Sequence, residues 1–155
     1  MGATVFESSV GPLTIVVDGD GALESIYFGL RRDVVISGER DCTTVVRQLG
    51  EYLRGERREF DLVLSPRGTG FQLAVWRELL LIPYGTTISY GALARRIGKP
   101  AAVRAVGAAN GANPIPIVIP CHRVIGANGT LTGYGGGLPI KRALLALEQP
   151  QRPLV

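Results

Sequence analysis

A cysteine and a histidine are neighbours at Cys121 and His122, and this histidine is the only one in the chain. A thiol titrates at about pH 8.5, so only a few per cent of it is nucleophilic thiolate at neutral pH unless a base or a positive charge lies close by. An imidazole is the side chain best suited to take that proton near neutrality. The pair therefore indicates an activated cysteine nucleophile.

The segment before the cysteine should hold it rigidly. Pro114, Pro116 and Pro120 fix the backbone angle φ and remove backbone donors, which excludes a central helix and predicts an apolar, strand-like strip at residues 115–119. Adjacent residues of an extended chain point to opposite faces, so the imidazole can act on the thiol only through a bridging water or a sharp bend. The alternative is a buried, inert cysteine beside a surface histidine.

Length and composition restrict the class of protein. The 155 residues, 46% of them hydrophobic, suffice for one domain or two small lobes with a proper core. We see no secretion signal, and the longest apolar runs fall far short of the roughly 18 residues that span a bilayer, so we expect a cytoplasmic protein without a membrane segment. We also expect a monomer. Cys42 and Cys121 should stay reduced, and a single histidine argues against a structural zinc site.

The first 65 residues predict a small α+β lobe. Apolar and polar positions alternate over residues 13–17 and 23–28, with glycine-rich turns between them, as in antiparallel hairpin strands. Apolar residues at helical spacing predict a helix over residues 45–53, and another short strand follows at residues 60–64.

The charge pattern changes after this lobe. Residues 1–65 hold 7 Arg and 11 Asp or Glu, a net charge of −4, whereas residues 66–155 hold 8 Arg, 2 Lys and only two acidic residues, a net charge of +8. A turn-rich linker at residues 65–68 coincides with the change, so we divide the chain into domains 1–65 and 66–155. The basic half favours a polyanionic partner such as nucleic acid; the alternative is a merely solvated basic surface.

Two helices and a tight turn in the basic half predict a helix-turn-helix. Ser89 can cap the first helix, a Gly-Lys-Pro turn follows at residues 98–100, and the second helix covers residues 101–110. This second helix carries small side chains and one long cation, Arg104, so it lacks the polar side chains that read base sequence in a major groove. Small residues let a helix approach a narrow groove, which suits a search for lesions; close packing against a neighbouring helix is the alternative.

The remaining segments should surround the cysteine. Thr69 can cap a helix whose Trp76 we assign to the core. Residues 126–137 are rich in glycine and contain Tyr134. This composition predicts a lid over a flat ring or, alternatively, a flexible linker. Pro139 suits the first turn of a final helix.

Taken together, several short motifs resemble the O6-alkylguanine-DNA alkyltransferases, also called methylated-DNA–protein-cysteine methyltransferases. The motifs lie within residues 69–148 and comprise Tyr90, Arg104-Ala105-Val106-Gly107, Asn113-Pro114, Pro120-Cys121-His122-Arg123-Val124 and Gly133-Tyr134. The resemblance implies an α+β fold, with a small ribonuclease-H-like α/β lobe at the N-terminus and a mainly helical C-terminal lobe that contains the helix-turn-helix.

The resemblance also implies a catalytic group. Cys121 would accept the alkyl group, His122 would act on it as a base through a water, and Glu148 would orient the histidine. Asn113 would brace the turn between the recognition helix and the active-site segment. No cofactor or metal is required.

Two further sets of residues follow from the resemblance. Those that would shape the pocket or contact the flipped guanine are Tyr90, Pro116, Val124, Tyr134, Gly135 and Lys141. Those that would bind double-stranded DNA through its minor groove are Ala102, Arg104, Ala105, Gly107 and Arg123, with Arg104 taking the place of the flipped nucleotide.

The implied chemistry is a single in-line displacement of guanine by a thiolate, and it leaves a thioether. A thioether offers no carbonyl for water to attack, so each molecule should repair one lesion in a single turnover. Three alternatives remain: a non-catalytic lesion sensor, a cysteine hydrolase that uses Cys121, His122 and Glu148, and a helix-turn-helix regulator that binds a specific sequence.

Overall fold

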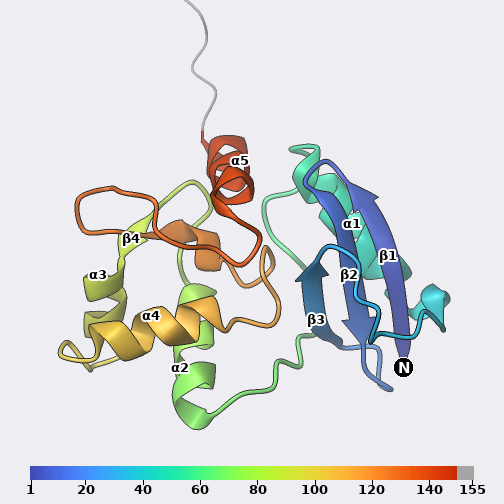
Figure 1. Cartoon of the computed structure of the whole chain (residues 1–155), viewed down its shortest axis with the longest axis horizontal. Helices are drawn as coiled ribbons and strands as arrows, with labels where there is room; N and C mark the ends of the chain where they lie inside the picture. The colour runs from blue at the N-terminus through green and yellow to red at the C-terminus, as the bar shows by residue number, and fades with distance from the viewer. Residues whose placement is uncertain (150–155) are drawn as a thin grey trace, which may run out of the picture.

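The computed structural model describes residues 1–149 and has a mixed α/β fold, with a small sheet beside a group of helices (Figure 1). The sheet is antiparallel, in the order β1 (Gly2–Ser8), β2 (Gly11–Val17) and β3 (Leu23–Phe28). The hairpin expected from the alternating pattern is confirmed, because Leu13 pairs with Phe28 and Ile15 with Ile26 in the β2–β3 ladder.

A helix packs against this sheet. The short 3₁₀ helix η1 (Glu39–Cys42) leads into α1 (Thr43–Leu53), which buries Val45, Leu49 and Tyr52 in the core. The helix predicted over residues 45–53 is therefore confirmed.

The strand predicted at residues 60–64 is wrong. The chain touches the sheet there through a single bridge between Leu23 and Leu64, with a hydrogen bond from the Leu23 N–H to the Val63 carbonyl at 2.9 Å. The apolar side chains of Phe60, Leu62 and Leu64 pack against the core, which explains the alternation without a continuous ladder.

The basic half begins with two capped helices. Thr69 and Gln72 form a capping box at the start of α2 (Gly70–Leu79), and Trp76 is buried in the core as expected, with its indole N–H bonded to the Ala109 carbonyl at 2.8 Å. Ser89 caps α3 (Tyr90–Arg96) through the Ala92 N–H at 3.0 Å.

A tight turn at Gly98, with φ of 75°, leads from α3 to α4 (Val103–Gly111). Helix α4 begins two residues later than expected and lies across α2 and α3 (Figure 1).

Residues 115–119 are buried but do not form the expected strand. The chain curls there, with φ of 74° at Ile117 and a hydrogen bond from the Ile119 N–H to the Ile115 carbonyl at 2.9 Å. The prolines at positions 114, 116 and 120 cannot donate to a ladder, which disfavours a strand there. The next strand along the chain is β5 (Val124–Ile125), which pairs in parallel with β4 (Ile88–Ser89).

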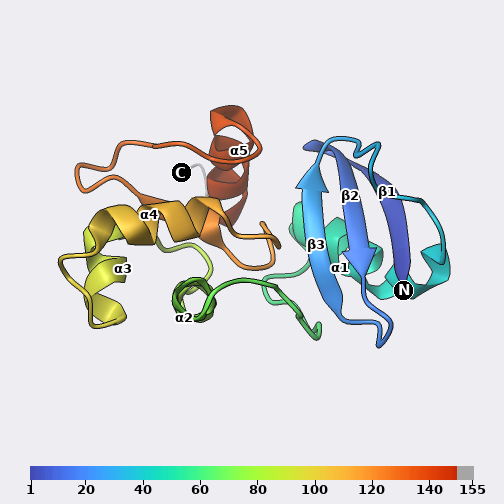
Figure 2. The ribbon, with the colours of Figure 1, turned by 60° about the horizontal axis from the view of Figure 1, so that its bottom comes forward.

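The last helix, α5 (Leu138–Glu148), starts with Pro139 in its first turn as expected. The sheet and α1 lie to one side of α2–α5 (Figure 2), and a hydrogen bond from the Ile26 N–H to the Pro114 carbonyl at 2.9 Å joins the two sides. Both cysteines are free, as expected. Within residues 1–149 no helix is long and apolar enough to cross a membrane, and no three potential ligand side chains gather around a metal position.

Candidate active site

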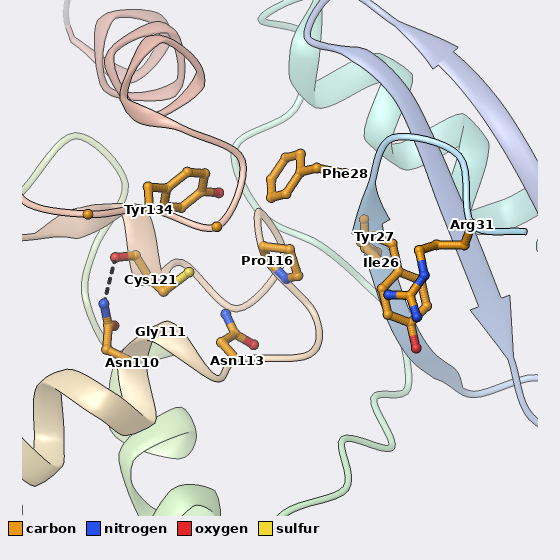
Figure 3. A pocket seen from close by; sticks show the side chains of 12 residues that line it. Ile26, Tyr27, Phe28, Arg31, Asn110, Gly111, Asn113, Pro116, Cys121 and Tyr134 are labelled. Carbon is orange, nitrogen blue, oxygen red and sulfur yellow. Dashed lines mark hydrogen bonds between the residues drawn. The ribbon is translucent and has the colours of Figure 1, made fainter. Parts of the chain in front are cut away.

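Cys121 begins a 3₁₀ turn, η2 (Cys121–Arg123), and lines a cavity of about 250 Å³. The Cys121 side chain lies between Tyr134 and Asn113, with β3 across the cavity (Figure 3). Burial raises the pKa of the thiol to about 11, although a hydrogen bond from Asn113 and the charge of Lys141 oppose this rise. The resting cysteine is therefore a thiol, and it needs a base to become a nucleophile.

The cavity is built by both halves of the chain. Its lining residues are Ile26, Tyr27, Phe28, Arg31, Asn110, Gly111, Asn113, Pro116, Cys121, Gly133, Tyr134 and Gly135. Three of the predicted pocket residues, Pro116, Tyr134 and Gly135, therefore line it. The other three, Tyr90, Val124 and Lys141, lie outside its lining.

The turn at η2 gives the sharp bend that an adjacent thiol and imidazole require. It directs His122 to α5, where the histidine Nε2 lies 2.9 Å from Glu148 Oε2 and both side chains are buried. Burial lowers the pKa of His122 despite the opposing effect of Glu148, so the imidazole is neutral at neutral pH. Since a carboxylate can only accept, Nε2 carries the proton, and Nδ1, which has no partner among residues 1–149, is the acceptor.

Arg123 is buried, so the expectation that it binds DNA is corrected. Its guanidinium holds the Glu148 carboxylate with Nε to Oε1 and Nη2 to Oε2, both at 2.8 Å, and Nη1 donates to the Ile82 carbonyl at 2.7 Å. A buried carboxylate requires such a partner, and this need decides the position of the arginine.

Tyr52 is a member of this network that the sequence did not reveal. Its hydroxyl, which comes from α1, donates to Glu148 Oε2 at 2.5 Å. Burial alone would raise the pKa of Glu148, but the hydrogen bonds from His122, Arg123 and Tyr52 hold it at about 2. Tyr52 falls at the helical spacing of a core residue, so nothing in its sequence context distinguishes it from an apolar neighbour.

Two asparagines stand beside Cys121. Asn113 braces residues 115–119, since its Nδ2 donates to the Ile119 carbonyl at 2.8 Å and its Oδ1 accepts from the Ile115 N–H at 2.9 Å. Asn110, at the end of α4, was not foreseen; its Nδ2 points at the Cys121 carbonyl at 3.4 Å (Figure 3).

The glycine-rich loop over residues 126–137 is held at several points. Lys141 is fully buried and donates to the Val124 carbonyl at 2.8 Å and to the Thr132 carbonyl at 3.2 Å. The Tyr90 hydroxyl bonds to Thr132 Oγ1 at 2.7 Å. These contacts position the loop that forms one side of the cavity.

The Tyr134 ring meets Phe28 of β3 edge to face, with 5.5 Å between ring centroids. A Cβ at Gly136 would lie 3.0 Å from the Phe28 ring, so this glycine lets the loop approach the sheet.

The outer surface of α4 is accessible to solvent and carries mainly small side chains. Arg104 and Ala105 are exposed, and Ala102 and Gly107 are partly exposed. The structure therefore places four of the five predicted DNA-binding residues on one accessible helix and its N-cap, and the fifth, Arg123, inside the protein.

Comparison with known proteins finds relatives over nearly the whole chain. A family model described as "6-O-methylguanine DNA methyltransferase, DNA binding domain" matches residues 70–150. The chain is 51% identical over 152 residues to a methylated-DNA–protein-cysteine methyltransferase of Mycobacterium bovis, with 95% of this chain and 92% of the relative covered. It is 49% identical over 150 residues to a protein of the same name from Methanosarcina acetivorans, with 93% and 96% covered.

A solved structure agrees with these relatives. Mycobacterium tuberculosis OGT in complex with DNA superposes on the chain with a TM-score of 0.90 at 48% identity, covering 96% of this chain and 93% of that one.

Proposed function

The chain belongs to the 6-O-methylguanine DNA methyltransferase family, and on that premise we propose which of its residues carry out the alkyl transfer. It is a DNA repair protein that transfers the alkyl group of O6-alkylguanine to its own cysteine in a single turnover. The observation that carries the assignment to residues is a buried thiol, Cys121, that lines a cavity and lies next to the His122–Glu148 pair.

In the proposed reaction, the thiol proton of Cys121 passes through a water to Nδ1 of His122. Glu148 stays ionised and steadies the imidazolium through Nε2. The thiolate then forms a bond to the alkyl carbon while the bond from that carbon to the guanine O6 breaks, and guanine takes up one proton. The proton lost by the thiol balances the proton gained by guanine, so no cofactor is consumed.

The pocket residues have supporting roles in this proposal. Pro116 and Gly135 border the alkyl end, and Tyr134 covers the base. Lys141 holds the loop and places positive charge near the departing oxygen, while Asn113 keeps the segment before Cys121 in its bend. Tyr90 contacts the base and the neighbouring phosphate, and the Val124 main chain offers a carbonyl to the base.

DNA is proposed to bind in its minor groove against α4 of a helix-turn-helix formed by α3 and α4. The small side chains at Ala102, Ala105 and Gly107 permit close approach, and the exposed Arg104 replaces the flipped nucleotide in the stack. The net charge of +8 over residues 66–155 supports this interface, because cationic side chains release the counterions of the phosphates.

Several coarser expectations stay proposals. We propose a ribonuclease-H-like lobe over residues 1–65 and a catalytic domain over residues 66–155, in a cytoplasmic monomer. The mixed α/β fold and the change of charge between the two segments support the division.

The Cys121→Ser variant tests the assignment of the nucleophile. We expect it to bind duplex DNA that carries O6-methylguanine as tightly as the wild type does but to remove no methyl group, because a hydroxyl is a far weaker nucleophile. Binding is measured by fluorescence anisotropy, and transfer by loss of the lesion. Transfer by this variant at the wild-type rate would assign the reaction to another residue.

A further inference from the structure

Asn110 is a polar side chain at the active site whose bonding is incomplete. It lies in the last turn of α4, is 5% exposed, and lines the same cavity as Cys121 (Figure 3). Its Nδ2 donates to the Cys121 carbonyl at 3.4 Å, whereas its Oδ1 is buried without a hydrogen-bond partner among residues 1–149.

The neighbouring carbonyl fixes the orientation of the Asn110 amide. Exchanging the amide nitrogen and oxygen would place two acceptor oxygens against each other, so Oδ1 must point away from the Cys121 carbonyl. A buried acceptor without a partner is unfavourable, and native proteins keep few of them unless a ligand or water completes them. Asn113, which lines the same cavity, differs because both of its side-chain heteroatoms bond to the main chain.

The chemistry of the substrate indicates which group can donate a hydrogen bond to Asn110 Oδ1. Alkylation at O6 holds the guanine ring in the form without a hydrogen on N1, so the exocyclic 2-amino group is the only hydrogen-bond donor left on the base. We propose that Asn110 Oδ1 accepts a hydrogen bond from this 2-amino group and thereby makes Asn110 a residue that determines specificity. This inference rests on the proposed function, since it presumes that the alkylated guanine enters this cavity.

The main-chain acceptors nearby leave room for such a role. The Val124 carbonyl already accepts one bond, from Lys141 at 2.8 Å, and the Cys121 carbonyl accepts two, from the Val124 N–H and from Asn110 at 3.4 Å. The Val124 oxygen can therefore accept one amino hydrogen with its second lone pair, and Asn110 Oδ1 can accept the other. An O4-alkylated thymine has no donor on its ring, so it would leave the Asn110 oxygen buried and unpaired, and the site should prefer guanine adducts.

The test compares two substrates that differ only in the 2-amino group. Single-turnover rate constants are measured for the wild type and Asn110→Ala with duplexes that carry either O6-methylguanine or O6-methylhypoxanthine at the same position. We expect removal of the amino group to slow the wild type about 10-fold more than it slows Asn110→Ala. Loss of the amino group also changes base pairing, but this effect is the same for both proteins. It cancels when the slowing of the wild type is divided by the slowing of Asn110→Ala.

Asn113→Ala serves as the matched control. It removes an asparagine from the same cavity, but one whose oxygen is already paired, so we expect it to slow both substrates by the same factor. An equal effect of amino-group removal on the wild type and Asn110→Ala would overturn the role of Asn110.

The same experiment distinguishes a failure of the Asn110 role from a failure of the proposed function. A wild type that transfers no methyl group from O6-methylguanine would refute the proposed function. Normal transfer from O6-methylguanine without coupling between Asn110 and the amino group would refute only the role of Asn110.

Discussion

At the scale of single residues, burial holds the proposed nucleophile in its protonated, less reactive form. The Cys121 thiol is buried, and its pKa is raised to about 11, while the only histidine is neutral and offers an acceptor nitrogen. Both facts follow from burial, which disfavours the charged form of each group. Because the protein can react only once, a protonated thiol protects it from alkylation by electrophiles other than its substrate.

The pH dependence of thiol reactivity tests this resting state. Because the pKa of Cys121 lies far above neutrality, its thiolate fraction should rise about tenfold for each pH unit between pH 6 and 9. Alkylation by iodoacetamide, quantified at Cys121 by peptide mapping, should follow that rise. The mapping separates this signal from Cys42, and a rate that levels off below pH 8 would mean that the free protein already holds a thiolate.

At the scale of elements, the caps made the helices predictable. Thr69 and Ser89 satisfy backbone donors at helix starts, and such local chemistry is visible in sequence. The bend at residues 115–119 was not predictable in this way, since the φ of 74° at Ile117 depends on the brace from Asn113 and on surrounding packing. An apolar run with prolines is compatible both with an extended segment and with the bent segment found here.

Helix α4 leads to a prediction about Arg104. If Arg104 fills the space of the flipped base, Arg104→Ala should slow repair of O6-methylguanine in a duplex about 10-fold or more. Its reaction with free O6-methylguanine base should stay close to that of the wild type. Arg96→Ala, which removes an exposed arginine from α3, is the control and should have a smaller effect on the duplex. Equal slowing of both reactions by Arg104→Ala would refute its role in flipping.

At the scale of the whole molecule, the active site depends on contacts between the two halves of the chain. Tyr52 of α1 bonds to Glu148, and Phe28 of β3 packs on Tyr134. The sequence predicted that His122 and Glu148 interact, because the family resemblance pairs them, and the structure has their side chains 2.9 Å apart. The sequence could not predict Tyr52 or the burial of Arg123, because pairs that are 96 and 25 residues apart are set by the tertiary fold.

The link through Tyr52 can be measured as stability. Tyr52→Phe removes a donor from a buried carboxylate while keeping the ring, so it should lower the free energy of unfolding by about 2 kcal/mol. Tyr27→Phe, in which the ring packs beneath Arg31, is the matched control and should change stability by less than about 0.5 kcal/mol. Urea denaturation of the three proteins gives both values. A Tyr52→Phe protein as stable as the wild type would show that the hydroxyl contributes no net stabilisation.

Intact-protein mass spectrometry with peptide mapping tests single-turnover transfer to Cys121. The protein is mixed with an excess of duplex DNA that carries one O6-methylguanine per molecule. We expect one added methyl group per protein, located on Cys121, and repair of one lesion per protein molecule. Repair of many lesions by each molecule, or a methyl group on any other residue, would contradict single-turnover transfer to Cys121.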